Sequence, residues 1–169
     1  MEHDMEGELR RIEPVLTEII GRPSRWSRLL IGRDLRWRTL IHELLHSYSA
    51  GYNSPDYDAY RGWEEGVVEQ LQRMLRQAAL TRIGVAVTDA VFEDEEASHR
   101  YNPFIAALEA LRAILGTQAE TFYLDLLAAP IRDRPGLLLG PGLALPPLQR
   151  TEYVKAFSRS DATLKERGP

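Results

Sequence analysis

The pentapeptide His42-Glu43-Leu44-Leu45-His46 constrains the fold of this chain more than any other stretch. It fits the zinc signature H-E-x-x-H, in which two histidines four positions apart lie on one face of a helix. Their neutral ring nitrogens can then bind the same metal ion. The intervening Glu43 lies beside that ion and is placed to accept a proton from a zinc-bound water. The motif therefore predicts a helix, a metal ion and a general base together.

The residues around this motif are predicted to form a helix from Leu35 to Ala50. Asp34 suits its N-cap, Gly51 suits its C-cap, and no proline lies between them. Its apolar residues form a broad face: Trp37, Leu40, Ile41, Leu44, Leu45 and Tyr48. A face of that width indicates a deeply buried helix. The alternative is that the two histidines are hydrogen-bonded members of a core helix without a metal ion.

A third ligand must come from elsewhere in the sequence. A zinc site that hydrolyses its substrate has three protein ligands and one open position. No cysteine is present, so the candidates are His3, His99 and the acidic side chains. Among the acids, Glu65 follows His46 after an interval of 18 residues, 47–64.

This H-E-x-x-H-x18-E spacing resembles that of the gluzincin metallopeptidases, and it is similar to their aminopeptidase branch, where a glycine also follows the glutamate. The resemblance covers about residues 34–76. It implies that His42, His46 and Glu65 bind Zn²⁺ and that Glu43 is the general base. The large members of the family have a longer upstream sheet subdomain than 34 residues could build. The resemblance therefore implies a minimal gluzincin.

Residues Asp56–Ala79 are predicted to form the second metal-binding helix, with apolar residues spaced by threes and fours: Tyr60, Trp63, Val67, Leu71, Met74 and Ala78. Glu65 and Glu69 then share a different face with Gly62. The resemblance implies that Glu69 orients a ligand histidine, and a carboxylate bonded to an imidazole N–H would fix the tautomer of the ring. Alternatively, Glu65 is a solvated carboxylate and Glu64 or Glu69 replaces it as the ligand.

Two glycines inside this second helix, Gly62 and Gly66, need an explanation. Each costs about 1 kcal/mol relative to alanine in a helix interior. Close approach to the first metal helix would account for both. The connection between the two helices, residues 52–58, is rich in turn-forming residues. Within and just after it, Tyr57 is a candidate for substrate contact, whereas Tyr60 follows the apolar rhythm and is expected to pack.

His99 and Tyr101 are candidates for stabilising the transition state. The resemblance implies that a tyrosine or histidine downstream of the third ligand hydrogen-bonds the oxyanion of the tetrahedral intermediate. That role suits a donor aimed at developing charge. No flanking motif selects between the two residues, and Tyr101 is placed slightly ahead of His99. The alternative for both is ordinary hydrogen bonding within a loop.

Composition narrows the classes of function. A chain of 169 residues with 44% hydrophobic content fits one domain with a real core. A net charge of -4 and a pI near 5.6 argue against a nucleic-acid binder. The lack of cysteine excludes disulfides and cysteine catalysis and favours the cytoplasm. The charged N-terminal residues predict no signal peptide, and no apolar run is long enough to span a membrane.

The flanking segments are predicted to be mostly helical. Residues 8–20 have helical spacing, with Pro14 either in the first turn of a helix that starts near Glu13 or at a kink. Ser24–Ile31 is the best candidate for a strand. Residues 80–92 fit a strand or a helix, and the acidic run 93–96 fits a solvated loop.

Two helices are expected to follow this region. The dipeptide Asn102-Pro103 predicts the start of a helix that stops at Gly116. Thr117–Glu120 fits a capping box that opens a helix to about Ala129.

The C-terminal part is expected to be largely irregular. Residues 135–148, PGLLLGPGLALPPL, are too rich in proline and glycine for a regular helix or a central strand. The preferred interpretation is an extended segment laid over the core, and a second one is a lid or self-inhibitory segment across the cleft. Leu148–Phe157 is predicted to be a short helix, followed by a polar tail, 158–169.

Together these patterns predict a mainly α protein, α+β at most, a compact zincin-like helical domain with a small or vestigial β-sheet. One domain, 1–169, would contain the metal helices within 34–76 and the extended segment and tail within 135–169. The predicted function is zinc-dependent hydrolysis of a peptide or protein substrate. The alternative is a non-cleaving or self-inhibited zincin scaffold that binds a peptide or protein partner. No nucleic-acid or membrane partner is expected.

Overall fold

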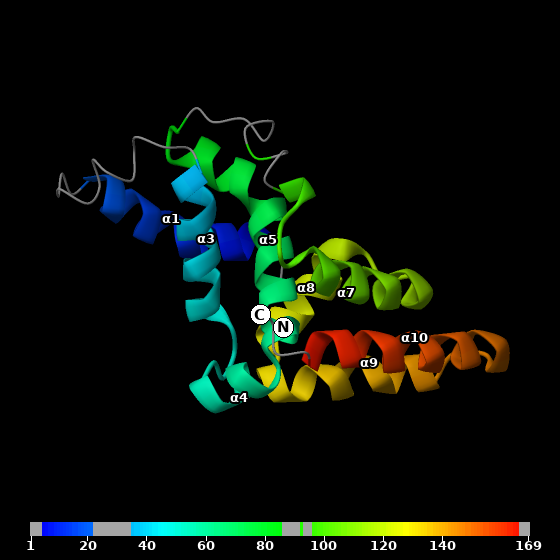
Figure 1. The fold of residues 1–169 in the computed structure, drawn as a ribbon. Helices are drawn as coiled ribbons and strands as arrows, with labels where there is room; N and C mark the ends of the chain where they lie inside the picture. Colours follow the sequence, from blue (N-terminus) through cyan, green and yellow to red (C-terminus); the bar gives the residue numbers. More distant parts are fainter. Residues whose placement is uncertain (1–4, 22–34, 86–91, 93–95, 166–169) are drawn as a thin grey trace.

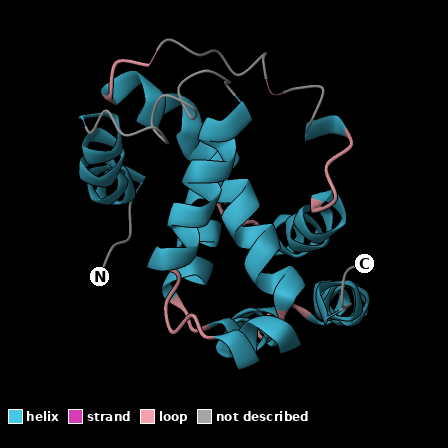
Figure 2. Cartoon of the chain, turned by 60° about the vertical axis from the view of Figure 1, so that its left-hand side comes forward, coloured by secondary structure: helices cyan, strands magenta, loops and turns pink. Residues whose placement is uncertain are grey.

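The computed structural model describes residues 5–21, 35–85, 92 and 96–165. Every regular element in these ranges is a helix, and none is a strand (Figures 1 and 2). The elements are α1 (Met5–Gly21), α3 (Leu35–Tyr48), α4 (Ser54–Ala59), α5 (Arg61–Arg82), α7 (Asn102–Leu115), α8 (Ala119–Ala128), the short 3₁₀ helix η2 (Ile131–Asp133), α9 (Arg134–Leu143) and α10 (Pro147–Lys165). The prediction of a mainly α protein is confirmed. The strand predicted at Ser24–Ile31 lies outside the described residues.

Helix α5 is the element around which the others pack. It contacts α1, α3, α4, α7, α8 and α10, and it lies in the middle of the fold in Figure 1. All residues from Gly62 to Glu69 are buried. Trp63, Val67 and Val68 have no exposed surface, so apolar side chains leave this helix in several directions. Because α5 is buried on several sides, the carboxylates that it carries lie among fixed neighbours and need hydrogen-bond or charged partners.

The two glycines of α5 face α10 and α7. A Cβ atom on Gly62 would lie 2.7 Å from the carbonyl oxygen of Leu164, in the last turn of α10. One on Gly66 would lie 3.0 Å from a methyl group of Leu108 and 3.1 Å from the Cβ of Phe104, both in α7. The expectation that these glycines allow α3 to approach α5 is therefore wrong. Their lack of a side chain instead allows α10 and α7 to pack closely against other faces of α5.

Helix α3 packs along α5 and carries the H-E-x-x-H pentapeptide. Trp37, Ile41 and Leu45 are buried on its inner face, as the apolar pattern predicted. The helix ends at Tyr48, two residues before the predicted end, and Gly51 then takes a left-handed φ of 62°. The connection predicted as a turn contains the short helix α4.

The N-terminal helix and the helices after residue 100 match the sequence patterns in most respects. Helix α1 continues through Pro14, so the alternative of a start near Glu13 is wrong. Helix α7 begins at Asn102 and ends before Gly116, whose φ of 67° is left-handed. Helix α8 lies within the predicted range, but its cap Gln118 makes no side-chain capping hydrogen bond, so the expected capping box does not form.

Two ambiguous segments are settled in part. Helix α5 continues to Arg82, so residues 80–82 are helical, while 86–91 lie outside the described residues. Of the acidic run, Glu96 is described. It pairs at 2.6 Å with the buried guanidinium of Arg76, so this member of the run is not a freely solvated carboxylate.

The prediction of an extended C-terminal segment is wrong. Residues 134–143 form α9, and residues 147–165 form α10, which is longer than the predicted 148–157 and includes most of the predicted tail. Pro135 lies in the first turn of α9, where a missing N–H costs nothing. The buried ring of Tyr153 lies against Gly142, and its hydroxyl donates to the carbonyl of Leu138 at 2.8 Å. Packing against α10 thus holds α9 in helical form (Figure 1).

No described helix is both long enough and apolar enough to cross a membrane.

Candidate metal centre

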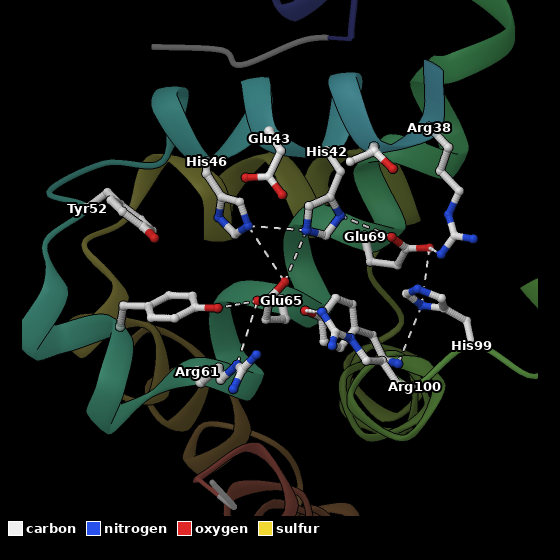
Figure 3. A pocket seen from close by; sticks show the side chains of 13 residues that line it. Arg38, His42, Glu43, His46, Tyr52, Arg61, Glu65, Glu69, His99 and Arg100 are labelled. Carbon is white, nitrogen blue, oxygen red and sulfur yellow. Dashed lines mark hydrogen bonds and ion pairs between the residues drawn. The ribbon is translucent and has the colours of Figure 1, made fainter. Parts of the chain in front are cut away.

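Three side chains from α3 and α5 converge at one point. The Nε2 atoms of His42 and His46 are 3.2 Å apart. The Oε2 atom of Glu65 lies 3.1 Å from Nε2 of His42 and 3.6 Å from Nε2 of His46. Figure 3 shows the two imidazoles reaching from α3 toward the carboxylate on α5. Among the described residues, these three form a group of ligand atoms close enough together to hold one metal ion.

The size of this triangle fits a tetrahedral metal ion. Zinc binds histidine nitrogen at about 2.0–2.1 Å and carboxylate oxygen at about 2.0–2.2 Å, so neighbouring ligand atoms in a tetrahedron lie about 3.3–3.4 Å apart. The three observed separations, 3.1, 3.2 and 3.6 Å, bracket that value. Three protein ligands would leave a fourth position open toward solvent or substrate.

Both imidazoles are held through their second nitrogen. The Nδ1 atom of His42 is 3.1 Å from Oε2 of Glu69, and Nδ1 of His46 is 2.7 Å from Oε1 of Glu64. If a metal ion binds Nε2, each ring is neutral and its Nδ1 donates to the carboxylate behind it, because a carboxylate accepts a hydrogen bond. The lone pair of each Nε2 then points into the triangle. A carboxylate behind each histidine is the usual partner of a metal-bound imidazole.

The role predicted for Glu69, orienting a ligand histidine, matches its position beside His42. Glu69 is in turn bound by Arg38 and Arg73, each with a nitrogen 3.0 Å from its Oε1 atom. The side chains of Arg38 and Glu69 are buried, and that of Arg73 is partly buried. The carboxylate is therefore fixed on both sides.

The partner of His46 is Glu64, which the sequence pattern suggested only as a substitute ligand and not as a group that orients a histidine. Glu64 has no exposed surface. Its Oε2 atom accepts from the hydroxyl of Ser49 at 2.8 Å and pairs with Nη1 of Arg134 at 2.7 Å. Arg134 is also fully buried and donates to Ser49 Oγ and to the backbone carbonyl of Trp63, at 2.6 and 3.0 Å.

The carboxylates around the two histidines favour a proton or a cation at the imidazole nitrogens. Burial acts to lower the pKa of His46, but hydrogen bonds that the ring donates to Glu64 and Glu65 outweigh it and raise the pKa to about 9. The pKa of His42 is also raised, because Glu65 and Glu69 outweigh its burial. Burial would raise the pKa of Glu69, but His42 and the neighbouring arginine charges lower it to about 2. The pKa of Glu65 is lowered further in the same way, by the histidines and Tyr57.

Glu43 lies on the exposed side of α3, between the two histidines in sequence. Its carboxylate lines the same cavity as the three candidate ligands and lies between the imidazoles in Figure 3. It is therefore beside the triangle without being part of it. This is the position that the H-E-x-x-H pattern predicts for a group that exchanges protons.

The two oxyanion candidates occupy different places. Tyr101 is buried, its ring stacks on that of His42 at 5.8 Å between centroids, and its hydroxyl accepts from Nη2 of Arg100 at 2.7 Å. Burial and the charge of Glu65 raise the pKa of Tyr101, so the hydroxyl keeps its proton at neutral pH. The Nδ1 atom of His99 instead lies 3.6 Å from Oε1 of Glu69, whose other oxygen contacts His42.

A cavity of about 300 Å³ opens in front of the triangle. Its walls include Tyr52 and Tyr57 from the connection between α3 and α5. The Tyr57 hydroxyl donates to Oε1 of Glu65, the oxygen that faces away from the histidines. Tyr60 packs against the core, as expected. No residue from the described part of the C-terminal segment, 135–165, lines the cavity, so the structure gives no support to a lid formed by that part.

Comparison with known proteins adds no relative. Neither a scan against models of protein families nor searches among curated proteins and solved structures gave a match to this chain.

Proposed function

We propose that this chain is a zinc-dependent peptidase in which His42, His46 and Glu65 bind Zn²⁺. One observation carries the proposal: three ligand atoms lie at tetrahedral spacing, and each imidazole is backed by its own buried carboxylate. A core histidine pair without a metal would need neither the convergence of both Nε2 atoms nor a carboxylate between them. Two buried imidazoles and a carboxylate are a donor set that suits zinc.

Zinc at this position would act as a Lewis acid toward a peptide carbonyl and make a coordinated water acidic enough to react near neutral pH. Glu43 accepts the proton of the attacking water, because its carboxylate lines the cavity beside the ligands. Glu43 then delivers that proton to the leaving amine. The phenol of Tyr101 donates to the carbonyl oxygen as negative charge develops on it, and its position over His42 makes it a better donor candidate than His99.

A peptide or protein is the substrate that we propose. The reactive positions lie at the wall of an open cavity rather than inside an enclosed one, so an extended chain can reach them. Tyr52 and Tyr57 form the wall beside His46, with their rings 5.5 and 6.1 Å from the imidazole. These rings offer apolar contact to a substrate side chain on that side.

The test compares three purified proteins: wild type, Glu43→Gln and His46→Ala. Metal analysis should find about one zinc per chain in wild type and in Glu43→Gln, and much less in His46→Ala. Mass spectrometry of a mixed peptide digest should find cleavage by wild type alone. Glu43→Gln is the informative variant, because it keeps the metal ligands and removes the base. If it cleaves peptides as fast as wild type, the proposed mechanism is wrong.

The second proposal, a metal-binding scaffold that holds a peptide or protein partner without cutting it, is separated by the same experiment. Zinc bound to wild type, with peptides retained on the protein and no cleaved products, would favour the scaffold over the peptidase.

A further inference from the structure

Two arginines from different parts of the chain, one before α7 and one at the start of α5, approach the hydroxyl of Tyr101. Arg100 precedes α7 and donates from Nη2 to that hydroxyl at 2.7 Å. Arg61 begins α5 and interacts with the same hydroxyl. Both guanidinium groups line the cavity in front of the metal triangle, and Figure 3 shows them on the side of Glu65 that faces away from α3.

Among the described residues, these two arginines differ from Arg38 and Arg73 in having no carboxylate within hydrogen-bond distance. Arg38 and Arg73 each lie 3.0 Å from Glu69. The nearest carboxylate oxygen to Nε of Arg61 is Oε1 of Glu65, at 3.8 Å, and the Tyr57 hydroxyl already donates to that oxygen. The Nε atom of Arg61 is buried and has no hydrogen-bond partner. Within the described residues, Arg100 forms no ion pair, and it is exposed.

The charge balance of the cavity also favours an anion. Its lining contains three arginines, Arg38, Arg61 and Arg100, and three glutamates, Glu43, Glu65 and Glu69. These charges cancel when the histidines are neutral, so a bound divalent ion leaves the cavity positive. A buried N–H without an acceptor and two neighbouring guanidinium groups bind a negatively charged oxygen more strongly than a neutral one.

We propose that Arg61 and Arg100, the two arginines beside the Tyr101 hydroxyl, form a subsite that binds a carboxylate group of the substrate. The inference rests on the proposed function for the nature of the substrate, a peptide. A guanidinium matches the planar carboxylate with two parallel hydrogen bonds. The subsite adjoins the metal triangle, because Arg61 approaches Oε1 of Glu65 while Oε2 of the same carboxylate faces the histidines. The bound carboxylate therefore belongs to a residue next to the scissile bond, as either its side chain or the C-terminus of the peptide.

Binding can be measured without turnover in zinc-loaded Glu43→Gln. The probes are four fluorescent hexapeptides of one core sequence: neutral with a free C-terminus, neutral with an amidated C-terminus, and amidated with one central Asp or with Asn in its place. The subsite predicts about tenfold tighter binding of at least one carboxylate peptide than of its amide counterpart. The free against amidated pair identifies a C-terminal carboxylate, and the Asp against Asn pair identifies a side chain.

Arg100→Gln, added to the same background, should reduce this preference to about twofold or less while zinc content stays unchanged. Arg61→Lys keeps the positive charge but loses the planar pair of donors, so it should reduce the preference in part. Arg132→Gln is the control, because Arg132 is exposed and does not line the cavity. A carboxylate preference that survives Arg100→Gln unchanged would show that Arg100 does not bind the anion, and would overturn the subsite.

The outcomes separate the inference from the proposed function. Equal binding of acid and amide peptides overturns the subsite, even if wild type cleaves all four. A preference that depends on Arg100 supports the subsite, even if wild type cleaves none of them and the peptidase proposal fails.

Discussion

Glu64 Oε1 lies 2.7 Å from Nδ1 of His46, while the other oxygen of the same carboxylate is bound to Arg134. The same order of groups occurs behind the second imidazole, where Glu69 joins His42 to Arg38. Each candidate ligand histidine is thus held by a carboxylate that is itself neutralised by an arginine. This double arrangement fixes the direction of both Nε2 atoms before any ion arrives.

Replacing Glu64 by glutamine should weaken metal binding. Glutamine keeps the size of the side chain but loses the charge that makes the His46 ring a better ligand. We expect the zinc affinity to fall about 10–100-fold, the range for losing such a partner. Competition with a chromophoric chelator measures it. Glu120→Gln, on the surface of α8, is the matched control, and an unchanged affinity in Glu64→Gln would show that the carboxylate does not support the ligand.

Replacing Arg134 by methionine should destabilise the whole protein. Glu64 would remain buried as a carboxylate without its counter-charge, which costs about 3–5 kcal/mol for a broken buried pair. Urea unfolding of the metal-free protein measures the loss. The double variant Glu64→Gln/Arg134→Met should recover part of the stability, because it leaves no buried charge behind. Strictly additive losses in the double variant would contradict the ion pair as the cause.

The stability of the metal-free protein should depend on pH in a defined direction. The pKa of His46 is raised from 6.5 to about 9, so its contribution is complete below pH 6.5 and disappears as the pH rises toward 9. The pKa of Glu69 is lowered from 4.5 to about 2, so its contribution is complete above pH 4.5 and disappears as the pH falls toward 2. The metal-free chain should be most stable between pH 4.5 and 6.5.

Excess zinc should reverse the upper part of this profile, because the metal binds the histidines without their protons. The gain in melting temperature on adding zinc should grow between pH 6.5 and 9. Thermal unfolding with EDTA and with zinc, across the same buffers, measures both curves. Parallel curves would mean that His42 and His46 do not exchange protons for the ion.

Removing the Tyr101 hydroxyl should lower kcat with little change in KM. An oxyanion donor acts mainly on the transition state, and the loss of one costs about 100-fold in kcat. Tyr101→Phe keeps the ring that stacks on His42. His99→Ala is the comparison, since His99 lies beside Glu69, with its Nδ1 atom 3.6 Å from Oε1, and its loss should affect kcat much less. If His99→Ala causes the larger loss in kcat, the two assignments must be exchanged.

Two glycines in α9 should respond to alanine in opposite ways. A Cβ atom on Gly142 would lie 1.9 Å from the buried ring of Tyr153, so Gly142→Ala should destabilise the fold by about 1–3 kcal/mol. A Cβ atom on Gly136 would meet nothing within 4 Å, so Gly136→Ala should be neutral or stabilise the helix by up to about 1 kcal/mol. Denaturant unfolding of both variants measures the difference. Similar effects would contradict the helical packing of this segment.

The metal helices could be predicted from sequence because their evidence is local. Two histidines four positions apart lie on the same face of a helix, and the apolar positions of α3 and α5 repeat with helical spacing. The interval to Glu65 then selected a carboxylate that the structure brings to 3.1 Å from His42. Such local patterns predict the metal helices because contacts between residues i and i+4 depend little on the rest of the fold.

Arg134 could not be predicted, because its partner is distant in sequence and the segment that follows it appeared irregular. The prolines and glycines of α9 have poor intrinsic helix propensity, and contact between Gly142 and Tyr153 overrides it. For Glu64 the sequence offered one indication: it follows Trp63 and lies three and four positions before the buried Val67 and Val68, and a carboxylate with such neighbours on a helix needs a partner. The glycines of α5 were explained by the wrong neighbour for the same reason, since sequence spacing does not say which helix approaches.

The position of Arg134 also bears on how the protein is made. A ribosome releases the chain from its N-terminus, so α3 and α5 emerge before the arginine that neutralises Glu64. Before Arg134 is synthesised, burying that carboxylate would cost a large desolvation free energy. The contact between Gly62 and the backbone of Leu164 forms later still. The nascent chain therefore completes the surroundings of His46 only after residue 134 has left the ribosome.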